Sequence, residues 1–383
     1  MMGKRIVVAS DSFKGSLSSL AVGQAISRGI KDLYPDDDVS VYPIADGGEG
    51  TVEAILANAQ GQERVVTVQG PLGQPVRARY GLIDQGKTAV IEMAEASGLT
   101  LVATEDQSLM QSSTYGTGQL LLDALEQQVT KIYLGLGGSA TNDGGLGLLA
   151  ALGVRFLDGS GKVLEPIAAN LAHIARIDVS GKNRALDAVD VVLLHDVTNP
   201  LCGENGATLV YGPQKGGLPQ DLQELDEAMA AYAHLAERVT GRQVKDSPGA
   251  GAAGGLGFAL MAFFQVQSEA GIDRILDLIG ISKAMAVADL VITGEGHMDG
   301  QSKNGKAPFG VAKLAQAHGL PTVAIVGSSS IASDESLSSG ISGVFAIVNR
   351  PMTLNEAMAD ASSLVTNTAK QVIQFYHRLS DGC

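Results

Sequence analysis

The 383 residues of this chain exceed what one hydrophobic core usually holds, so the length alone predicts two domains. Apolar residues make up 45% and charged residues 18%, which is the composition of a folded protein and excludes a disordered one. With 27 basic and 41 acidic side chains the formal net charge is −14, which repels nucleic acids at long range and argues against binding of DNA or RNA.

Cysteine content and hydrophobic runs point to a cytoplasmic setting. The two cysteines, Cys202 and Cys383, are too few for a disulfide framework, which favours a reducing compartment. The apolar run at residues 6–9 is too short for a signal peptide, and no run of about 18 or more apolar residues predicts a membrane span. We therefore expect a cytoplasmic protein with small-molecule partners, without a nucleic-acid or membrane partner, and compatible with a homo-oligomer.

The first 60 residues alternate strands with helices. Apolar runs predict strands at 6–9 and 39–43, and helical spacing behind a serine cap predicts a helix over 18–31. A second helix is expected over 50–58. This alternation is typical of a parallel sheet with crossover helices.

The pattern changes near residue 63 and returns near residue 289. Short strands at 65–68 and 78–83 flank a Gly-Pro-Leu-Gly turn as in an antiparallel hairpin, which indicates a second sheet. We therefore predict a doubly wound α/β domain of residues 1–64 and 286–383, split by an inserted second α/β domain of residues 65–285. The C-terminal elements expected are strands at 290–293, 322–327 and 344–348 and helices at 310–318 and 354–376.

Glycine is unusually frequent, with 48 residues where average usage gives roughly 27. Residues 131–149 combine a strand, a glycine-rich loop and an apolar helix that opens near Gly144, an arrangement whose backbone N–H groups suit a phosphate. A turn followed by a helix cap would use the same residues, with Asp143 either capping the helix or holding Mg²⁺. The residues that we expect to bind the cofactor are Gly137, Gly138, Ser139, Thr141, Asn142 and Gly144.

A second glycine loop, at residues 249–257, leads into an apolar segment at 258–264. Its small residues suit either a phosphate or close packing of a helix, and the sequence leaves both interpretations open.

Residues 300–307 fit the spacing of a P-loop, but Ala307 stands where Ser or Thr is needed for Mg²⁺. We reject a P-loop and keep Lys306 as a phosphate contact. Glu295 and Asp299 follow the strand at 290–293, where ligands bind in open α/β sheets, so they are candidate metal ligands. A solvated loop is the alternative.

Two further acidic loops follow the first two strands of the predicted sheet. They contribute Asp11, Ser12 and Lys14 after one strand and Asp46 and Glu49 after the next. Because both loops lie at carboxyl ends of strands in one sheet, they favour a shared site for a polyanion and a metal ion.

The inserted segment supplies a candidate base and a candidate cation. Asp196 follows the apolar strand that ends at Leu194, next to an Asn-Pro turn at Asn199, and is a candidate general base or metal ligand. Lys215 lies among turn residues and suits a carboxylate or phosphate, although a solvated surface lysine explains it equally well. His195 alone is more often structural than catalytic.

Seven motifs in order along residues 11–312 resemble the glycerate kinase type-1 family, the bacterial kinases that act on D-glycerate. Seven ordered motifs are far more specific than any single glycine loop. The motifs are DSFKGSLS from Asp11, PIADGGEGT from Pro43, GLGGSATNDGGLG from Gly135, HDVTNPLCGENGA from His195, YGPQKGG from Tyr211, GAGAAGGLGF from Gly249 and ITGEGHMDGQSKNGKAPFGVA from Ile292.

The resemblance implies an ATP-dependent kinase that uses Mg²⁺ and phosphorylates D-glycerate, with 2-phosphoglycerate as the expected product. It also implies a flavodoxin-like domain beside a second domain with a mixed sheet, which agrees with the division predicted from periodicity. Ala307 stands where the resemblance leads us to expect Thr, so no hydroxyl role is assigned there.

Phosphoryl transfer mainly requires positioning and charge compensation, which glycine loops, metal ligands and lysines supply. We expect the nucleotide phosphates against residues 137–145. A glycerate 3-kinase, a Mg²⁺-dependent phosphohydrolase and a non-catalytic nucleotide or sugar-acid sensor are the rival hypotheses. The expected roles are catalysis for Asp196, Lys14, Lys215 and Asp46, metal binding for Asp46, Glu295 and Asp299, and substrate binding for Asp11, Ser12, Glu49 and Asn199.

Overall fold

The computed structural model describes residues 3–299 and 306–380, and the chain divides into two compact units. The terminal unit comprises residues 1–46, 53–59 and 271–383, and the inserted unit comprises residues 47–52 and 60–270. The segment 271–285, which the sequence placed in the insertion, lies in the terminal unit. There α9 (Gly271–Leu278) packs on α11 (Ala307–Ala317), with Ile272 directly against Gly310.

The sheet of the terminal unit consists of five parallel strands. Their order is β2-β1-β11-β13-β15, which becomes 2-1-3-4-5 when the strands are renumbered within the unit. This is the flavodoxin-like doubly wound order, so the predicted fold class is confirmed. The strands are β1 (Arg5–Ser10), β2 (Asp38–Val41), β11 (Leu290–Gly294), β13 (Thr322–Val326) and β15 (Gly343–Ala346).

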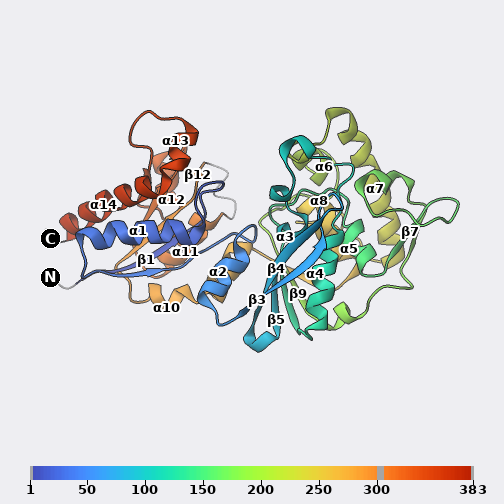
Figure 1. Ribbon diagram of the computed structural model, residues 1–383, viewed down its shortest axis with the longest axis horizontal. Helices are drawn as coiled ribbons and strands as arrows, with labels where there is room; N and C mark the ends of the chain where they lie inside the picture. The colour runs from blue at the N-terminus through green and yellow to red at the C-terminus, as the bar shows by residue number, and fades with distance from the viewer. Residues whose placement is uncertain (1–2, 300–305, 381–383) are drawn as a thin grey trace. The chain divides into compact units, whose positions relative to one another are not determined.

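Both faces of this sheet are covered, because alternate side chains of a strand point to opposite faces. Ile325 of β13 packs into the cluster formed with α1 (Ser19–Leu33) and α14 (Ala361–Ser380), which lie side by side (Figure 1). Ala324 and Val326 of the same strand pack into a separate cluster with α11. The remaining helices of the unit are α2 (Thr51–Asn58), which begins in the inserted unit, α10 (Ile281–Met285) and α12 (Ser333–Ser338), and β12 (His297–Met298) pairs with β14 (Ser328–Ser329).

The single closing helix predicted for residues 354–376 is wrong, because two helices occupy this stretch. They are α13 (Leu354–Ala359) and α14, and Asp360 separates them with φ −91° and ψ 2°. The α13 carbonyl of Met358 accepts a hydrogen bond from the Ser16 hydroxyl at 2.8 Å. The N–H of Asp360 donates to the same carbonyl, so a local and a tertiary donor together satisfy this acceptor in the last turn of α13.

The inserted unit is built on a mixed six-stranded sheet with the order β10-β9-β6-β5-β4-β3. The first three strands along the chain pair antiparallel and the others parallel, which confirms the predicted hairpin and the predicted second sheet. The strands are β3 (Gln62–Gln69), β4 (Pro75–Ile83), β5 (Thr88–Glu92), β6 (Lys131–Gly135), β9 (Asp190–Leu194) and β10 (Val266–Glu269).

A large apolar core joins this sheet to its helices. Tyr232 of the longest of these helices meets Phe156 and Phe258 edge to face. The helices are α3 (Ala94–Ser97), α4 (Tyr115–Glu126), α5 (Leu146–Ala151), α6 (Ala207–Tyr211), α7 (Pro219–Thr240) and α8 (Ala252–Phe263), and β7 (Arg155–Leu157) pairs with β8 (Arg176–Asp178).

The glycine loop at residues 249–257 serves close packing, the second of its two interpretations. A Cβ at Gly254 would lie 2.1 Å from the carbonyl oxygen of Thr141, and one at Gly255 would lie 2.8 Å from Gly144 Cα. Both glycines have positive φ, at 63° and 90°. Glycine is needed here because two backbone segments touch in a conformation that side chains disfavour.

No helix in the described part of the chain is long and apolar enough to cross a membrane.

Candidate active site

A pocket of about 630 Å³ lies in the terminal unit. It lies where β1 and β11 end in register, with Ser10 beside Gly294. The strand order reverses at this point, and ligands of open α/β sheets bind there. Six of the residues expected from the sequence line the pocket together: Asp11, Ser12, Lys14, Asp46, Glu295 and Lys306.

Negative charge dominates the polar side of this pocket. Burial, together with the charge of Asp46, raises the pKa of the Asp11 carboxyl to about 7, while the Ser12 N–H and the Lys14 ammonium oppose the shift. Glu295 adds a smaller effect in the same direction as Asp46. The pocket therefore holds more negative charge than its lysines balance, which favours a bound cation.

Lys306 contacts two of the predicted metal ligands, Glu295 and Asp299. Its Nζ lies 3.5 Å from Glu295 Oε2 and 3.8 Å from Asp299 Oδ1. Lys306 thus contacts carboxylates as well as facing the pocket, and Asp299 lies next to this group without lining the pocket. Residues 300–305 of the rejected P-loop pattern lie outside the described residues.

Within residues 3–299 and 306–380, no group of three His, Cys, Asp or Glu side chains is arranged to hold a metal ion. Mg²⁺ is usually bound through one or two carboxylates together with water and substrate phosphates, not by a cage of protein ligands. Asp46 and Glu295, which both act on Asp11, match that requirement for few ligands in an electronegative pocket.

The inserted unit carries its polar loops at a second row of strand ends. Glu92 of β5, Gly135 of β6 and Leu194 of β9 are in register, and the candidate loops follow the last two. Lys215 is buried there, and its Nζ donates to Ser139 Oγ and to the Thr141 carbonyl oxygen, both at 2.8 Å.

Burial lowers the pKa of Lys215 to about 7, against the opposing charge of Asp143. The interpretation of Lys215 as a solvated surface lysine is therefore excluded.

The loop at residues 137–145 uses several of its N–H groups inside the protein. Asn142 also donates from its side-chain Nδ2 to Thr208 Oγ1 at 2.9 Å, and both Thr141 and Asn142 are fully buried. Solvent reaches the loop at residues 137–139. The backbone donors and their acceptors are Gly137 N to Gly47 O at 3.3 Å, Asn142 N to Ser112 Oγ at 3.2 Å and Gly144 N to Gly254 O at 3.0 Å.

Asp143 caps the following helix, which decides between its two predicted roles. Its Oδ1 accepts from Gly145 N at 3.1 Å and its Oδ2 from Gly147 N at 2.9 Å. Oδ2 also accepts from the N–H and the hydroxyl of Thr114, each at 2.8 Å. With four donors directed at one buried carboxylate, Asp143 organises the loop.

The loop after β9 contains Asp196, which is half-buried, and Asn199, whose side chain is used within the loop. The Asn199 Nδ2 donates to Asn205 O at 2.7 Å, and its Oδ1 accepts from the Tyr211 hydroxyl at 2.9 Å. Burial lowers the pKa of His195, in agreement with a structural role. Glu49 is exposed in the segment 47–52 of the inserted unit.

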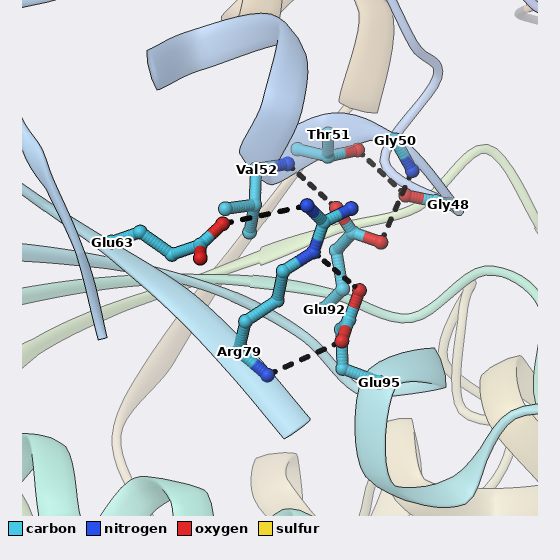
Figure 2. Close-up of polar contacts among 8 residues, drawn as sticks. All are labelled: Gly48, Gly50, Thr51, Val52, Glu63, Arg79, Glu92 and Glu95. Carbon is cyan, nitrogen blue, oxygen red and sulfur yellow. Dashed lines mark hydrogen bonds and ion pairs between the residues drawn. The ribbon is translucent and has the colours of Figure 1, made fainter. Parts of the chain in front are cut away.

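Glu92 is a residue that the sequence analysis missed (Figure 2). Its buried carboxylate accepts from Gly50 N at 3.1 Å and from Val52 N at 2.6 Å, so it fixes the segment that follows Asp46. Burial raises its pKa to about 7, and the two N–H groups oppose that shift. The sequence signal that could have identified it is a carboxylate placed directly at the end of the apolar strand β5.

A charged cluster lies beside Glu92. Arg79 forms ion pairs with Glu95 at 3.0 Å and with Glu63 at 3.4 Å (Figure 2). Within this cluster the Glu95 charge raises the pKa of Glu92 more than the Arg79 charge lowers it, so the cluster adds to the effect of burial.

The comparisons with known proteins agree along nearly the whole chain. The sequence model of the glycerate kinase family matches residues 6–377. The chain is 45% identical over 367 residues to a glycerate kinase of Halalkalibacterium halodurans, covering 96% of this chain and 97% of that protein. It is 42% identical over 368 residues to the glycerate 2-kinase of Escherichia coli K12, with the same coverage of 96% and 97%.

A solved structure is similar over the same span. A crystal structure from Salmonella typhimurium LT2, assigned as glycerate kinase 2, has a TM-score of 0.85 and 42% sequence identity, and the match covers 99% of this chain and 100% of that one.

Proposed function

Because this chain belongs to the glycerate kinase family and is a phosphotransferase with an alcohol acceptor, we propose that it transfers the γ-phosphoryl group of ATP to the 2-hydroxyl of D-glycerate. The products are ADP and 2-phospho-D-glycerate. The observation that carries this proposal is the pocket at the ends of β1 and β11, where lysines and carboxylates expected from the family motifs gather. Similarity to the E. coli glycerate 2-kinase supports the 2-position.

Mg²⁺ would be held by Asp46 and Glu295. Asp299, the third predicted metal ligand, lies beside them, because Lys306 forms ion pairs with both Glu295 and Asp299. When bound, Mg²⁺ neutralises charge on the phosphates and orients them. Lys14 and Lys306 face the same pocket and supply the fixed positive charge for the nucleotide phosphates. Because several backbone donors of the loop 137–145, among them those of Gly137, Asn142 and Gly144, serve protein acceptors, we assign these two lysines as the stronger phosphate contacts.

The acceptor side of the reaction is assigned to Asp196 and Lys215. Asp196 takes the proton of the attacking hydroxyl as general base. Lys215, held by Ser139 and Thr141, pairs with the glycerate carboxylate or the transferred phosphoryl group. An anion beside Lys215 would raise its pKa from about 7 and keep it charged.

The remaining predicted contacts divide by what their side chains already do. Asp11 and Ser12 line the pocket and are assigned to substrate, and the exposed Glu49 keeps that assignment as well. Asn199 is assigned to positioning of the Asp196 loop, because both polar atoms of its amide already have partners.

The test is ADP release from purified protein with Mg-ATP, with and without D-glycerate, with the product coupled directly to enolase. The proposal predicts ADP release that depends on glycerate and an enolase signal without a mutase. ADP release without glycerate would indicate a phosphohydrolase. An enolase signal that appears only after a phosphoglycerate mutase is added would indicate a 3-kinase, and ATP binding without turnover would indicate a sensor.

A further inference from the structure

The pocket in the terminal unit has a second side that the phosphoryl-transfer chemistry does not use. One side of the pocket carries the carboxylates and lysines. The other side is an apolar wall, formed by residues that follow β15, residues of α13 and the first residue of α14. The apolar wall consists of Ile347, Val348, Met352, Leu354, Ala357, Met358 and Ala361.

Two of these side chains are open to solvent. Val348 is 41% exposed and Leu354 is 74% exposed. Single exposed apolar residues are ordinary, but here they border one pocket together with two methionines, whose flexible side chains adapt to a ligand surface. Burial of this surface by a ligand would be favourable.

The wall is held in a fixed position relative to the polar side. The Ser16 hydroxyl donates to the Met358 carbonyl oxygen at 2.8 Å, and a Cβ at Gly15 would lie 3.1 Å from Met358 Cε. Gly15 and Ser16 belong to the loop that also carries Asp11 and Lys14. The same loop therefore supports the apolar wall and contributes to the charged side, and the site needs little ordering on binding.

The size of the pocket limits the ligand. Sites of about 300–1,000 Å³ enclose molecules of drug size, and at about 630 Å³ this pocket far exceeds a three-carbon acid. Glycerate also has no apolar body that would cover Val348 and Leu354. The pocket combines an apolar wall with two lysines and with several carboxylates suited to Mg²⁺. This combination matches a molecule that has a flat base at one end and phosphates at the other.

We infer that the apolar wall binds the base and ribose of a nucleoside di- or triphosphate, with its phosphates directed toward Lys14 and Lys306. This inference rests on the proposed function for the identity of the nucleotide as ATP and its product ADP. It places nucleotide recognition within the terminal unit.

The experiment measures binding of Mg-ADP by calorimetry to the wild-type chain and to the double variant Val348→Ala/Leu354→Ala. A matched control is Val287→Ala/Leu379→Ala, which removes the same atoms from residues 51% and 58% exposed in the same unit but outside the pocket. We expect ADP affinity to fall about tenfold in the pocket variant, because apolar contact with the base is lost. The control variant should bind as the wild type does.

Inorganic tripolyphosphate with Mg²⁺ separates the base from the phosphates. It should bind the wild-type chain and the pocket variant equally, because it has no base. Unchanged ADP affinity in the pocket variant, absence of ADP binding to the wild type, or an equal loss of tripolyphosphate affinity would overturn the inference.

Turnover assays distinguish this outcome from failure of the proposed function. If the wild type lacks glycerate-dependent ADP release but ADP binding still depends on Val348 and Leu354, the nucleotide site stands and the kinase proposal fails. If turnover is present and the pocket variant raises KM for D-glycerate without raising KM for ATP, the kinase proposal stands and the inference is overturned.

Discussion

The terminal unit and the inserted unit both carry polar loops at the carboxyl ends of parallel strands, yet they use those loops differently. In the terminal unit the loops after β1 and β11 leave a pocket of about 630 Å³. In the inserted unit the buried part of the loop after β6, at residues 140–145, is occupied by contacts with Gly254, Ser112 and Thr208. A glycine-rich loop at a helix start is therefore insufficient to identify a phosphate site, since the destination of its N–H groups decides its role.

The largest expected effect comes from the catalytic base, and it shows which of the two units supplies that base. Asp196→Asn should lower kcat by about 10² to 10⁴-fold, because the side chain can no longer accept the hydroxyl proton. Glycerate-dependent ADP release measures this loss, with thermal unfolding as the control for folding. If Asp196→Asn keeps more than about a tenth of kcat while Asp46→Asn abolishes it, the base belongs to the terminal unit.

The contact between the two glycine loops can be broken by one methyl group. Gly254→Ala should destabilise the protein by about 2–4 kcal/mol, since the new Cβ meets the Thr141 carbonyl oxygen in a strained conformation. Gly280→Ala is the matched control, with φ of 67° and no atom within 4 Å, and should cost about 1–2 kcal/mol from backbone strain alone. Denaturant unfolding compares the two, and equal losses would show that the packed loops do not restrict position 254.

The buried Lys215 makes the free energy of unfolding depend on pH. Its pKa is lowered to about 7 in the folded chain, so between pH 7 and its ordinary value of 10.5 the unfolded chain binds more protons. The free energy of unfolding should therefore rise with pH across that window, and Lys215→Met should remove this contribution. Lys215→Met should also cost about 1–3 kcal/mol through loss of the hydrogen bond to the buried Thr141 carbonyl.

Unfolding of both proteins at pH 7 and pH 10 tests this prediction. The wild type should gain stability relative to Lys215→Met at the higher pH, and parallel pH profiles would contradict the buried position of the ammonium group.

Glu92 should show the opposite and smaller dependence. Its pKa is raised to about 7 from an ordinary value of 4.5, so between these values the folded chain binds more protons. The free energy of unfolding should fall as pH rises through this window, and Glu92→Gln should flatten that slope. Glu92→Gln should also cost about 1 kcal/mol, because the amide nitrogen cannot accept from either Gly50 or Val52.

Unfolding of the Glu92 variant between pH 5 and pH 7.5 measures the slope, with Glu63→Gln as the control on an exposed partner of Arg79. A slope that is identical in the wild type and in Glu92→Gln would place the titrating group elsewhere.

Much of the fold could be predicted because apolar periodicity is local. Short apolar runs predict all five strands of the terminal sheet and β3, β4, β6 and β9 of the inserted sheet, whereas β5 and β10 were not predicted. The motifs after β1 and β11 meet because parallel strands end at one edge. The break between α13 and α14 could not be predicted, since no Gly or Pro marks it in the sequence and the contact of Ser16 with Met358 joins residues 342 positions apart.

The inserted unit shows the same limit at its loops. Lys215 resembles a surface turn in sequence, and the contacts with Ser139 and Thr141 that bury it come from a segment 74 to 76 residues earlier. Glu92 is inconspicuous at the end of an apolar strand, and its partners lie 40 and 42 residues away. Roles set by long-range hydrogen bonds are absent from local sequence pattern.

The measurement that tests the kinase assignment most directly is proton-coupled phosphorus NMR of the product formed from ATP and D-glycerate. Phosphate on the 2-oxygen couples to the single proton of a methine carbon, so we predict a doublet for the new ester. A triplet, from phosphate on the methylene oxygen, would contradict the 2-kinase assignment, and inorganic phosphate alone would contradict transfer to glycerate.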